Sequence, residues 1–181
     1  MKKKSDSQKE FGYKLMRPFV TIKFKNKYHP VVFGKENIPE KGGIVVCGNH
    51  RHVDDQYNAL IATKRVVHML AKDEYFKGKK EWFYRMAGCI PVDRSIHDEN
   101  AKSEAIEVLK NNEVIGIFPE GTVNRTNDII LPFKYGAVSF AKKTGAYIVP
   151  FTITGKYKLF RRSIKITYGK PYKVTNDLEI E

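Results

Sequence analysis

Short apolar runs alternate with stretches of helical periodicity along this chain, and the alternation constrains its fold more than any other feature. It is typical of domains in which helices connect mainly parallel strands. We therefore predict a single-domain α/β fold with a mainly parallel central sheet flanked by helices. The expected strands are Val31–Phe33, Ile44–Cys47, Val66–Leu70, Val114–Phe118, Tyr147–Thr152 and Ile164–Tyr168, and the expected helices are Asp55–Thr63, Glu81–Ala87, Glu99–Lys110 and Tyr135–Lys143.

Length and charge narrow the class of protein. A chain of 181 residues with 41% hydrophobic residues can bury the core of one domain. Lys and Arg total 33 against 20 Asp and Glu, which gives a net charge of +13. Such a charge favours nucleic acid, an anionic membrane surface or phosphorylated substrates as partners. Cys47 and Cys89 lie far apart and are expected to be reduced core thiols of a cytosolic protein.

The N-terminal stretch is basic and amphipathic. We predict that residues 1–30 associate with membrane and that residues 31–181 form the α/β domain. No apolar run reaches about 18 residues, so no transmembrane helix is expected. Pro18 is expected to divide the stretch into two short segments, and its apolar face could instead pack on the protein's own core. The side chains expected to enter lipid are Phe11, Tyr13, Leu15, Met16, Phe19, Val20, Ile22 and Phe24, with Lys2, Lys3, Lys4, Lys14, Arg17 and Lys23 facing anionic headgroups.

The segment Ile44-Val-Val-Cys-Gly-Asn-His50-Arg-His-Val-Asp-Asp55 carries the strongest chemical signal. An apolar strand ends before His50, and Asp55 lies where the next helix begins. A carboxylate bonded to one imidazole nitrogen fixes the tautomer and leaves the other nitrogen to take a proton from a hydroxyl. We predict that His50 is a general base oriented by Asp55. The alternative is a structural turn histidine.

The spacing of this pair is not specific by itself, because His68 and Asp73 repeat it. His68 lies inside the apolar run Val66–Leu70, which is an expected strand. We therefore predict a structural position for His68.

Three further segments place polar residues beside apolar strands or helix starts. In Gly88–Arg94 a short apolar strand delivers Arg94, whose planar guanidinium suits phosphate. In Val114–Thr122 an apolar strand runs into Pro-Glu-Gly-Thr, where backbone amides could cup an anion. Lys134 lies near a helix start, which is unfavourable unless an anion is close. Taken singly, these segments could equally be a surface ion pair or an ordinary turn.

Taken in order, the motifs resemble the glycerolipid acyltransferase family. They are Asn-His-x4-Asp, Gly-x-Ile-Pro-Val-Asp-Arg, Phe-Pro-Glu-Gly-Thr and Val-Pro, and the resemblance covers residues 31–171. The sequence is similar in particular to bacterial 1-acyl-glycerol-3-phosphate acyltransferases, also called lysophosphatidic acid acyltransferases. The resemblance implies an acyltransferase domain over residues 31–181 that makes phosphatidic acid in phospholipid biosynthesis.

The resemblance also implies roles for individual residues. His50 and Asp55 match the catalytic pair, and Arg94 with the loop Glu120-Gly121-Thr122 would bind the glycerol phosphate. Lys72, in Ala71-Lys72-Asp73-Glu74, matches a family lysine near the phosphate.

One position departs from the family pattern. The family usually has Arg directly after Glu-Gly-Thr, whereas this chain has Val123 there and Arg125 two residues further on. Either a shifted loop brings Arg125 to the phosphate or the contact is absent. With Arg125 and Lys134 included, the expected substrate-binding residues are Lys72, Arg94, Glu120, Gly121, Thr122, Arg125 and Lys134.

The implied reaction moves a fatty acyl group from acyl-CoA or acyl-carrier protein to the free hydroxyl of 1-acyl-glycerol-3-phosphate. His50 would take the hydroxyl proton and return it to the leaving thiolate. Cys47 lies within an expected buried strand and is not expected to act as a nucleophile. Because a thioester is already activated, no metal or other cofactor is expected. A lysophospholipid substrate implies a peripheral enzyme on the cytoplasmic side of the cell membrane, with no nucleic-acid partner.

Several alternatives stay open from the sequence alone. The acceptor could be another lysophospholipid or glycerol-3-phosphate. A metallohydrolase is a second class, because His50-x-His52-x-Asp54-Asp55 is similar to the His-x-His-x-Asp-His ligand motif of metallo-β-lactamases, although only His68 and His97 follow it. A basic nucleic-acid-binding module would fit the net charge of +13 but has no recognisable motif here.

Overall fold

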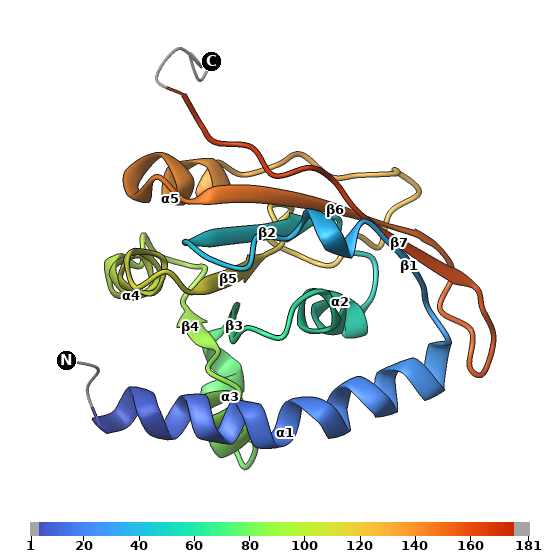
Figure 1. Ribbon diagram of the computed structural model, residues 1–181, viewed down its shortest axis with the longest axis horizontal. Helices are drawn as coiled ribbons and strands as arrows, with labels where there is room; N and C mark the ends of the chain where they lie inside the picture. Colours follow the sequence, from blue (N-terminus) through green and yellow to red (C-terminus); the bar gives the residue numbers. More distant parts are fainter. Residues whose placement is uncertain (1–3, 176–181) are drawn as a thin grey trace.

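A seven-stranded sheet forms the centre of the protein, with helices on both of its faces (Figure 1). The computed structural model describes the backbone of residues 4–175 and the side chains of residues 11–175. The strands are β1 (Val31–Phe33), β2 (Ile44–Gly48), β3 (Val67–Lys72), β4 (Ile90–Val92), β5 (Val114–Ile117), β6 (Tyr147–Gly155) and β7 (Ile164–Tyr168). The helices are α1 (Lys4–Tyr28), α2 (Gln56–Ala62), α3 (Glu81–Met86), α4 (Glu99–Lys110) and α5 (Gly136–Thr144), with 3₁₀ turns η1 (Lys35–Asn37), η2 (Val53–Asp55) and η3 (Asp73–Phe76).

The strand order is β1-β7-β6-β2-β5-β3-β4, and each neighbouring pair is parallel except β6 and β7. The predicted mainly parallel sheet is therefore confirmed, and every expected strand and helix is present. The largest difference at a strand end is in β6, which continues beyond Thr152 to Gly155.

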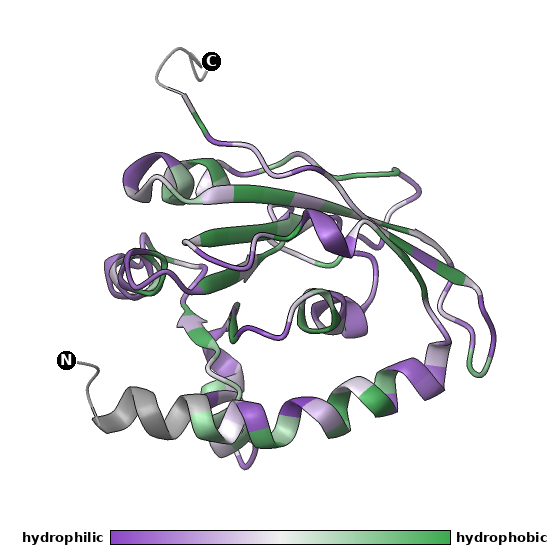
Figure 2. Cartoon of the chain, viewed as in Figure 1, coloured by the Kyte–Doolittle hydropathy of each residue, from purple (hydrophilic) through white to green (hydrophobic). Residues whose placement is uncertain are grey.

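The central strands β2 and β5 are buried on both faces, which explains their continuous apolar runs (Figure 2), whereas β7 alternates buried and exposed residues. Successive strand residues point to opposite faces. Ile44 and Val46 therefore pack towards α1 and α2, whereas Val45 packs towards α4 and α5. Parallel strands bring their carboxyl ends to one edge, where ligands of such sheets bind. The loops after β2, β4 and β5 meet at this edge.

The expectation that Pro18 divides the N-terminal stretch was wrong, because α1 runs unbroken through it. Pro18 lies on the exposed side of the helix. Its ring therefore costs one backbone hydrogen bond on that side. The opposite side is held by tertiary packing, since Tyr13, Phe24 and Tyr28 are buried. Arg17 adds side-chain hydrogen bonds to backbone carbonyls around the end of α2.

The same packing corrects part of the expected membrane face. Tyr13 and Phe24 belong to the core. Arg17 donates hydrogen bonds to backbone carbonyls around the end of α2 and does not face lipid headgroups. Lys2 and Lys3 lie outside the described residues. Within residues 4–175, none of the helices combines the length and the apolar character needed to span a bilayer.

Candidate active site

His50 and Asp55 form a hydrogen-bonded pair at the carboxyl end of β2. His50 Nδ1 lies 3.0 Å from Asp55 Oδ2. The same oxygen accepts the backbone amides of Arg51 at 2.6 Å and His52 at 2.7 Å. Asp55 is fully buried, and its Oδ2 accepts two backbone amides, so this oxygen is an acceptor and Nδ1 carries the proton. The lone pair of His50 therefore lies on Nε2, which is the arrangement that a general base requires.

Tyr157 completes the contacts of Asp55 from a distant part of the chain. Its hydroxyl donates to Asp55 Oδ1 at 2.6 Å and accepts from Asn58 Nδ2 at 3.0 Å. Burial of the phenol and the negative charge of Asp55 both raise the pKa of Tyr157 well above its usual range. Tyr157 therefore stays a neutral donor and fixes the carboxylate that orients His50.

The Phe-Pro-Glu-Gly-Thr segment holds His50 from the other side. The Phe118 ring stacks on the His50 ring, with centroids 4.0 Å apart and planes 11° apart. The Glu120 carboxylate is buried and accepts the backbone amides of His50 at 2.7 Å and Leu131 at 3.0 Å. The His50 carbonyl accepts the Asn124 amide at 2.6 Å. Glu120 thus binds the protein's own backbone and positions His50.

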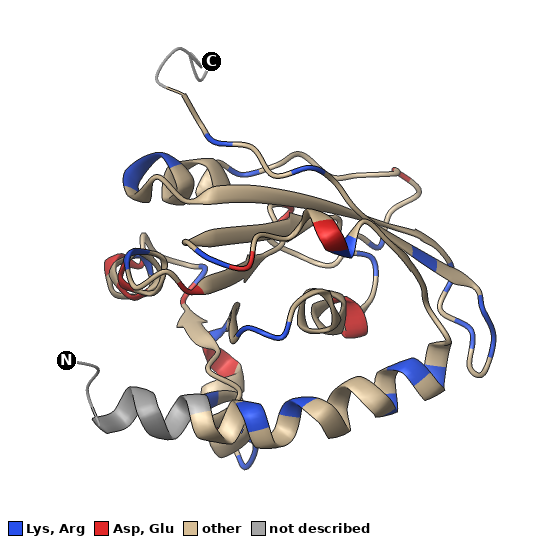
Figure 3. Cartoon of the chain, in the orientation of Figure 1, with Lys and Arg blue, Asp and Glu red and all other residues tan. Residues whose placement is uncertain are grey.

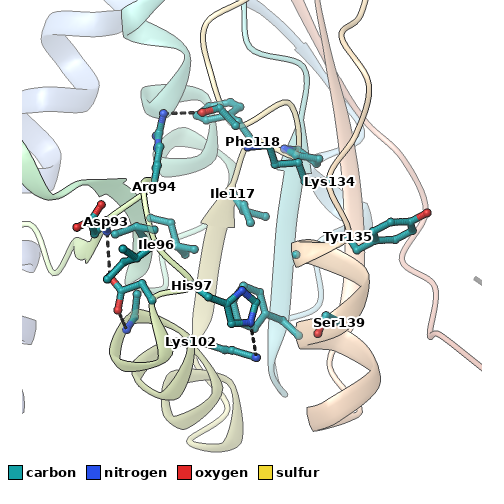
Figure 4. Close-up of a pocket in the computed structure, with 18 of the residues that line it drawn as sticks. Asp93, Arg94, Ile96, His97, Lys102, Ile117, Phe118, Lys134, Tyr135 and Ser139 are labelled. Atoms are coloured by element: carbon teal, nitrogen blue, oxygen red, sulfur yellow. Dashed lines mark hydrogen bonds between the residues drawn. The ribbon is translucent and has the colours of Figure 1, made fainter.

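A pocket of about 480 Å³ opens beside His50, between the start of α4 and the start of α5 (Figure 4). Arg94 and Lys134 lie at the end of the pocket near Phe118, whereas His97 and Lys102 lie at the other end. The walls between them are largely apolar, and they include Leu70, Val92, Ile96, Ile117 and Phe140.

Gly121 brings two cations together at the pocket. Arg94 Nη1 donates to the Gly121 carbonyl at 2.5 Å. The Lys134 Nζ lies 3.1 Å from the position that a Cβ on Gly121 would occupy. Gly121 has a φ of +70°, which favours glycine, and the lack of a side chain leaves room for Lys134. Within the described part of the chain, neither cation forms an ion pair with a carboxylate, so both are available to an anionic group.

The other expected binding residues lie outside the lining of this pocket. Lys72 pairs with Glu74 at 2.6 Å. Thr122 and Arg125 are exposed on the loop after β5. The Asn124 side chain is buried and bonds to Thr126 and Asp128, which fixes the path of this loop. The structure therefore brings Arg94, Gly121 and Lys134 together with His50 around the pocket. Lys72, Thr122 and Arg125 do not line it.

His68, which repeats the His50–Asp55 spacing with Asp73, occupies the predicted structural position. His68 lies in β3 and is not among the residues that line the pocket. Its ring nitrogens are bonded to the Gly88 carbonyl at 2.7 Å and to the Glu113 carboxylate at 3.1 Å. Cys47 lies in β2, and burial raises the pKa of its thiol to about 11. The thiol is therefore protonated at neutral pH and a poor nucleophile.

The side chains of the possible metal motif point to separate partners. His52 Nδ1 accepts the Asp54 amide at 3.1 Å, and its ring stacks on Tyr157 with centroids 4.2 Å apart. Asp54 accepts from Lys27 at 3.0 Å and Tyr28 at 2.6 Å. Among residues 11–175, no group of three or more His, Cys, Asp or Glu side chains is arranged to hold a metal ion.

Known proteins share both the sequence pattern and the fold. The family described as Acyltransferase matches residues 29–154. This chain belongs to the acyltransferase family. The resemblance predicted from the motifs is thereby confirmed.

Two relatives of this acyltransferase are named as 1-acyl-sn-glycerol-3-phosphate acyltransferases. The protein of Bacillus subtilis is 33% identical over 148 residues, which cover 77% of this chain and 72% of the relative. The protein of Borreliella burgdorferi is 33% identical over 142 residues, which cover 77% of this chain and 56% of the relative.

The fold of this acyltransferase also matches a solved structure. The crystal structure of the 1-acyl-sn-glycerophosphate acyltransferase PlsC from Thermotoga maritima superposes with a TM-score of 0.70. The match covers 99% of this chain and 76% of that protein at 23% sequence identity. It supports the α/β fold predicted from the alternation of strands and helices.

Sequence reasoning on this acyltransferase missed three residues that hold His50 and Asp55 in place. Phe118 lies in the same motif as Glu120 and Gly121, and an aromatic residue at a strand end beside a loop of polar residues is a usable signal. Asn124 and Tyr157 gave no signal, because their contacts with the His50 segment depend on how distant loops meet.

Proposed function

We propose that this acyltransferase moves a fatty acyl group to the free hydroxyl of 1-acyl-glycerol-3-phosphate and so makes phosphatidic acid. The observation that carries the proposal is the oriented His50–Asp55 pair, which lies beside a pocket that also holds Arg94 and Lys134. The names of the two bacterial relatives support the same acceptor.

The proposed reaction uses His50 twice. Nε2 accepts the proton of the glycerol hydroxyl while the oxygen attacks the thioester carbon. The carbon–sulfur bond then breaks, and the imidazolium returns the proton to the thiolate. Asp55 stays ionised and stabilises the imidazolium between the two steps. No covalent acyl-enzyme is needed, which agrees with the protonated state of the Cys47 thiol.

The pocket suits an acceptor with a charged and an apolar part. Arg94 can donate two parallel hydrogen bonds to a phosphate, and Lys134 adds a point charge at the same place. The apolar walls formed by residues such as Ile117 and Phe140 suit a fatty chain. Another lysophospholipid with one phosphate would meet the same groups, as would glycerol-3-phosphate without use of the apolar walls.

We further propose that the donor is an acyl thioester of coenzyme A or of acyl-carrier protein and that no metal or other cofactor takes part. A thioester has a good leaving group, and the chain supplies the base. The enzyme would meet its lipid as a peripheral protein on the cytoplasmic side of the membrane.

An outward stripe on α1 supports this peripheral position. Phe11, Leu15, Phe19 and Ile22 recur at helical spacing and are between 57% and 71% exposed. They lie opposite the side of the helix that packs on the core. Lys23 and Lys25 are exposed near the same stripe and can face anionic headgroups.

Mass spectrometry of the products tests the proposed function. The purified protein is offered acyl-CoA or acyl-carrier protein with a panel of lysophospholipids and glycerol-3-phosphate. We expect phosphatidic acid from 1-acyl-glycerol-3-phosphate as the main product. A main product from another acceptor would overturn the assigned substrate, and no acyl transfer to any acceptor would overturn the proposed function.

A further inference from the structure

The loop between β6 and β7, residues 156–163, exposes an apolar pair among cations. We call it the hairpin tip. Leu159 is 57% exposed and Phe160 is 74% exposed. The sequence from Gly155 to Lys165 contains no acidic residue, and Figure 3 shows basic residues along this loop. The exposed cations are Lys156, Lys158, Arg161, Arg162 and Lys165.

The hairpin tip is held in shape by its own hydrogen bonds. The Lys156 amide donates to the Ser163 carbonyl at 3.2 Å, and the Lys158 amide donates to the Ser163 hydroxyl at 3.1 Å. Phe160 has a φ of +56°, which is unfavourable for a bulky side chain. A bulky residue keeps such a backbone conformation only where its surroundings hold it.

The strained residue is anchored to α1. The Phe160 amide donates to the Lys27 carbonyl at 2.7 Å, so the hairpin tip is fixed to the carboxyl end of that helix (Figure 1). The outward stripe of α1 ends near this point, at Ile22. The outward stripe and the hairpin tip therefore lie next to each other on the protein surface. Both are exposed and apolar, and both have cations beside them.

We propose that the hairpin tip is a second membrane-contact site, separate from the outward stripe of α1. Leu159 and Phe160 enter the boundary between headgroups and acyl chains, while Lys158, Arg161 and Arg162 bind the phosphates of anionic lipids. An apolar pair projecting among cations matches the layers of such a surface, with phosphates outside and hydrocarbon inside. The inference rests on the proposed function, because a lipid substrate brings the enzyme to the bilayer.

A membrane contact at the hairpin tip would orient the active site relative to the bilayer as well as bind the protein to it. Tyr157, which fixes Asp55, belongs to the hairpin tip and lies two residues before Leu159. A membrane contact at the tip, together with one along α1, would set the orientation of the protein on the surface. One contact alone would leave it free to rotate about that contact.

Tryptophan fluorescence tests the inserted position directly. The chain has one tryptophan, Trp82, so the double variant Trp82→Phe/Phe160→Trp reports from the hairpin tip alone. With vesicles of phosphatidylcholine and phosphatidylglycerol, we expect a blue shift of the emission and quenching by lipids brominated on their acyl chains. Unshifted emission under conditions in which the variant sediments with the vesicles would overturn the proposal, and so would failure to sediment at all.

A matched pair of charge variants tests the lipid specificity. Lys158→Gln/Arg161→Gln/Arg162→Gln removes three cations from the tip, and Lys110→Gln/Lys142→Gln/Lys143→Gln removes three from the ends of α4 and α5. We expect the tip variant to bind the anionic vesicles about 100-fold more weakly and the control to bind within about fivefold of the unmodified protein. Equal losses in the two variants would overturn the proposal.

An acidic protein partner is the competing occupant. If the tip variant bound vesicles normally and lost transfer only from acyl-carrier protein, the tip would be a carrier-protein site and the lipid proposal would fail. The two vesicle measurements need no acyl transfer. Absence of transfer to lysophospholipids would therefore overturn the proposed function and leave the vesicle results to decide the hairpin tip.

Discussion

At the scale of residues, the site is organised around one buried carboxylate. Both oxygens of Asp55 are occupied, Oδ2 by His50 and two backbone amides and Oδ1 by Tyr157. A buried charge is stable only when it is hydrogen-bonded in this way. The arrangement holds the imidazole in one tautomer before substrate arrives, which is the preorganisation that a general base needs.

We predict that Tyr157→Phe lowers kcat about tenfold without unfolding the protein, because Asp55 loses the hydrogen bond that holds its carboxylate in the position His50 needs. With one donor fewer, Asp55 stabilises the His50 imidazolium more strongly. The acidic limb of the pH–rate profile should therefore move to higher pH, and NMR should show the imidazolium persisting to higher pH. A fall in rate with an unmoved profile would mean that Tyr157 acts only through packing.

Arg94→Ala should weaken use of the acceptor by about 10- to 100-fold in kcat/KM, because one charge-assisted contact to phosphate is removed. The Michaelis constant for the acyl donor should change little. Arg125→Ala is the matched control, since Arg125 is exposed and lies outside the pocket lining. A change confined to the Michaelis constant for the acyl donor would assign Arg94 to the donor site instead.

The contact between His50 and Asp55 could be predicted at this scale because both residues lie within one short segment. His50 and Asp55 are separated by a turn, so local geometry nearly determines their contact. The roles of Glu120 and Tyr157 could not be predicted. A glutamate in a strand-end motif looks the same in sequence whether it faces substrate or, as here, a backbone amide.

At the scale of elements, α1 is joined to the loop that carries His50 and Asp55. Asp54, next to Asp55, accepts hydrogen bonds from Lys27 and Tyr28 at the end of that helix. Burial opposes ionisation of Asp54, but the hydrogen bonds from Tyr28 and Lys27 outweigh it and lower the pKa of this carboxyl. The helix that carries the outward stripe is thus tied to the segment that carries His50.

Asp54→Asn should lower the free energy of unfolding by about 1 kcal/mol at neutral pH. A depressed folded pKa stabilises the protein above the unfolded value of 3.8, and this contribution is lost as pH falls through the folded pKa. Denaturant unfolding should therefore show a difference from the unmodified protein that shrinks as pH falls below 3.8. Asp73→Asn, on an exposed pair with Lys77, is the control. A difference that does not depend on pH would contradict this account.

The elements themselves were largely predictable, and α1 shows where the prediction failed. Strands buried on both faces read as apolar runs, and their order along the chain gave the α/β fold. The expectation that Pro18 divides the N-terminal stretch into two segments rests on local propensity without tertiary packing. Tyr13, Phe24 and Tyr28 pack on α2 and the sheet and stabilise the helix across the proline.

At the scale of the whole molecule, α1 carries both core residues and the outward stripe, and a truncation would remove the two together. Deleting residues 1–24 would remove Tyr13 and Phe24 from the core along with the outward stripe. Leu15→Ser/Phe19→Ser changes the stripe alone. We predict about tenfold weaker binding to anionic vesicles, further weakened by added salt, with a melting temperature within about 2 °C of the original. Unchanged vesicle binding would show that the outward stripe does not contact the membrane.

The central claim is that His50, oriented by Asp55, is the base of an acyl transfer to a lysophospholipid. The most direct measurement compares His50→Ala with His68→Ala, with transfer to 1-acyl-glycerol-3-phosphate followed by mass spectrometry and folding checked by circular dichroism. We predict that His50→Ala loses about two to four orders of magnitude in rate. His68→Ala should stay within about tenfold, because His68 lies in β3 and is not among the residues that line the pocket. Equal losses in two folded variants, or full activity of His50→Ala, would contradict the account.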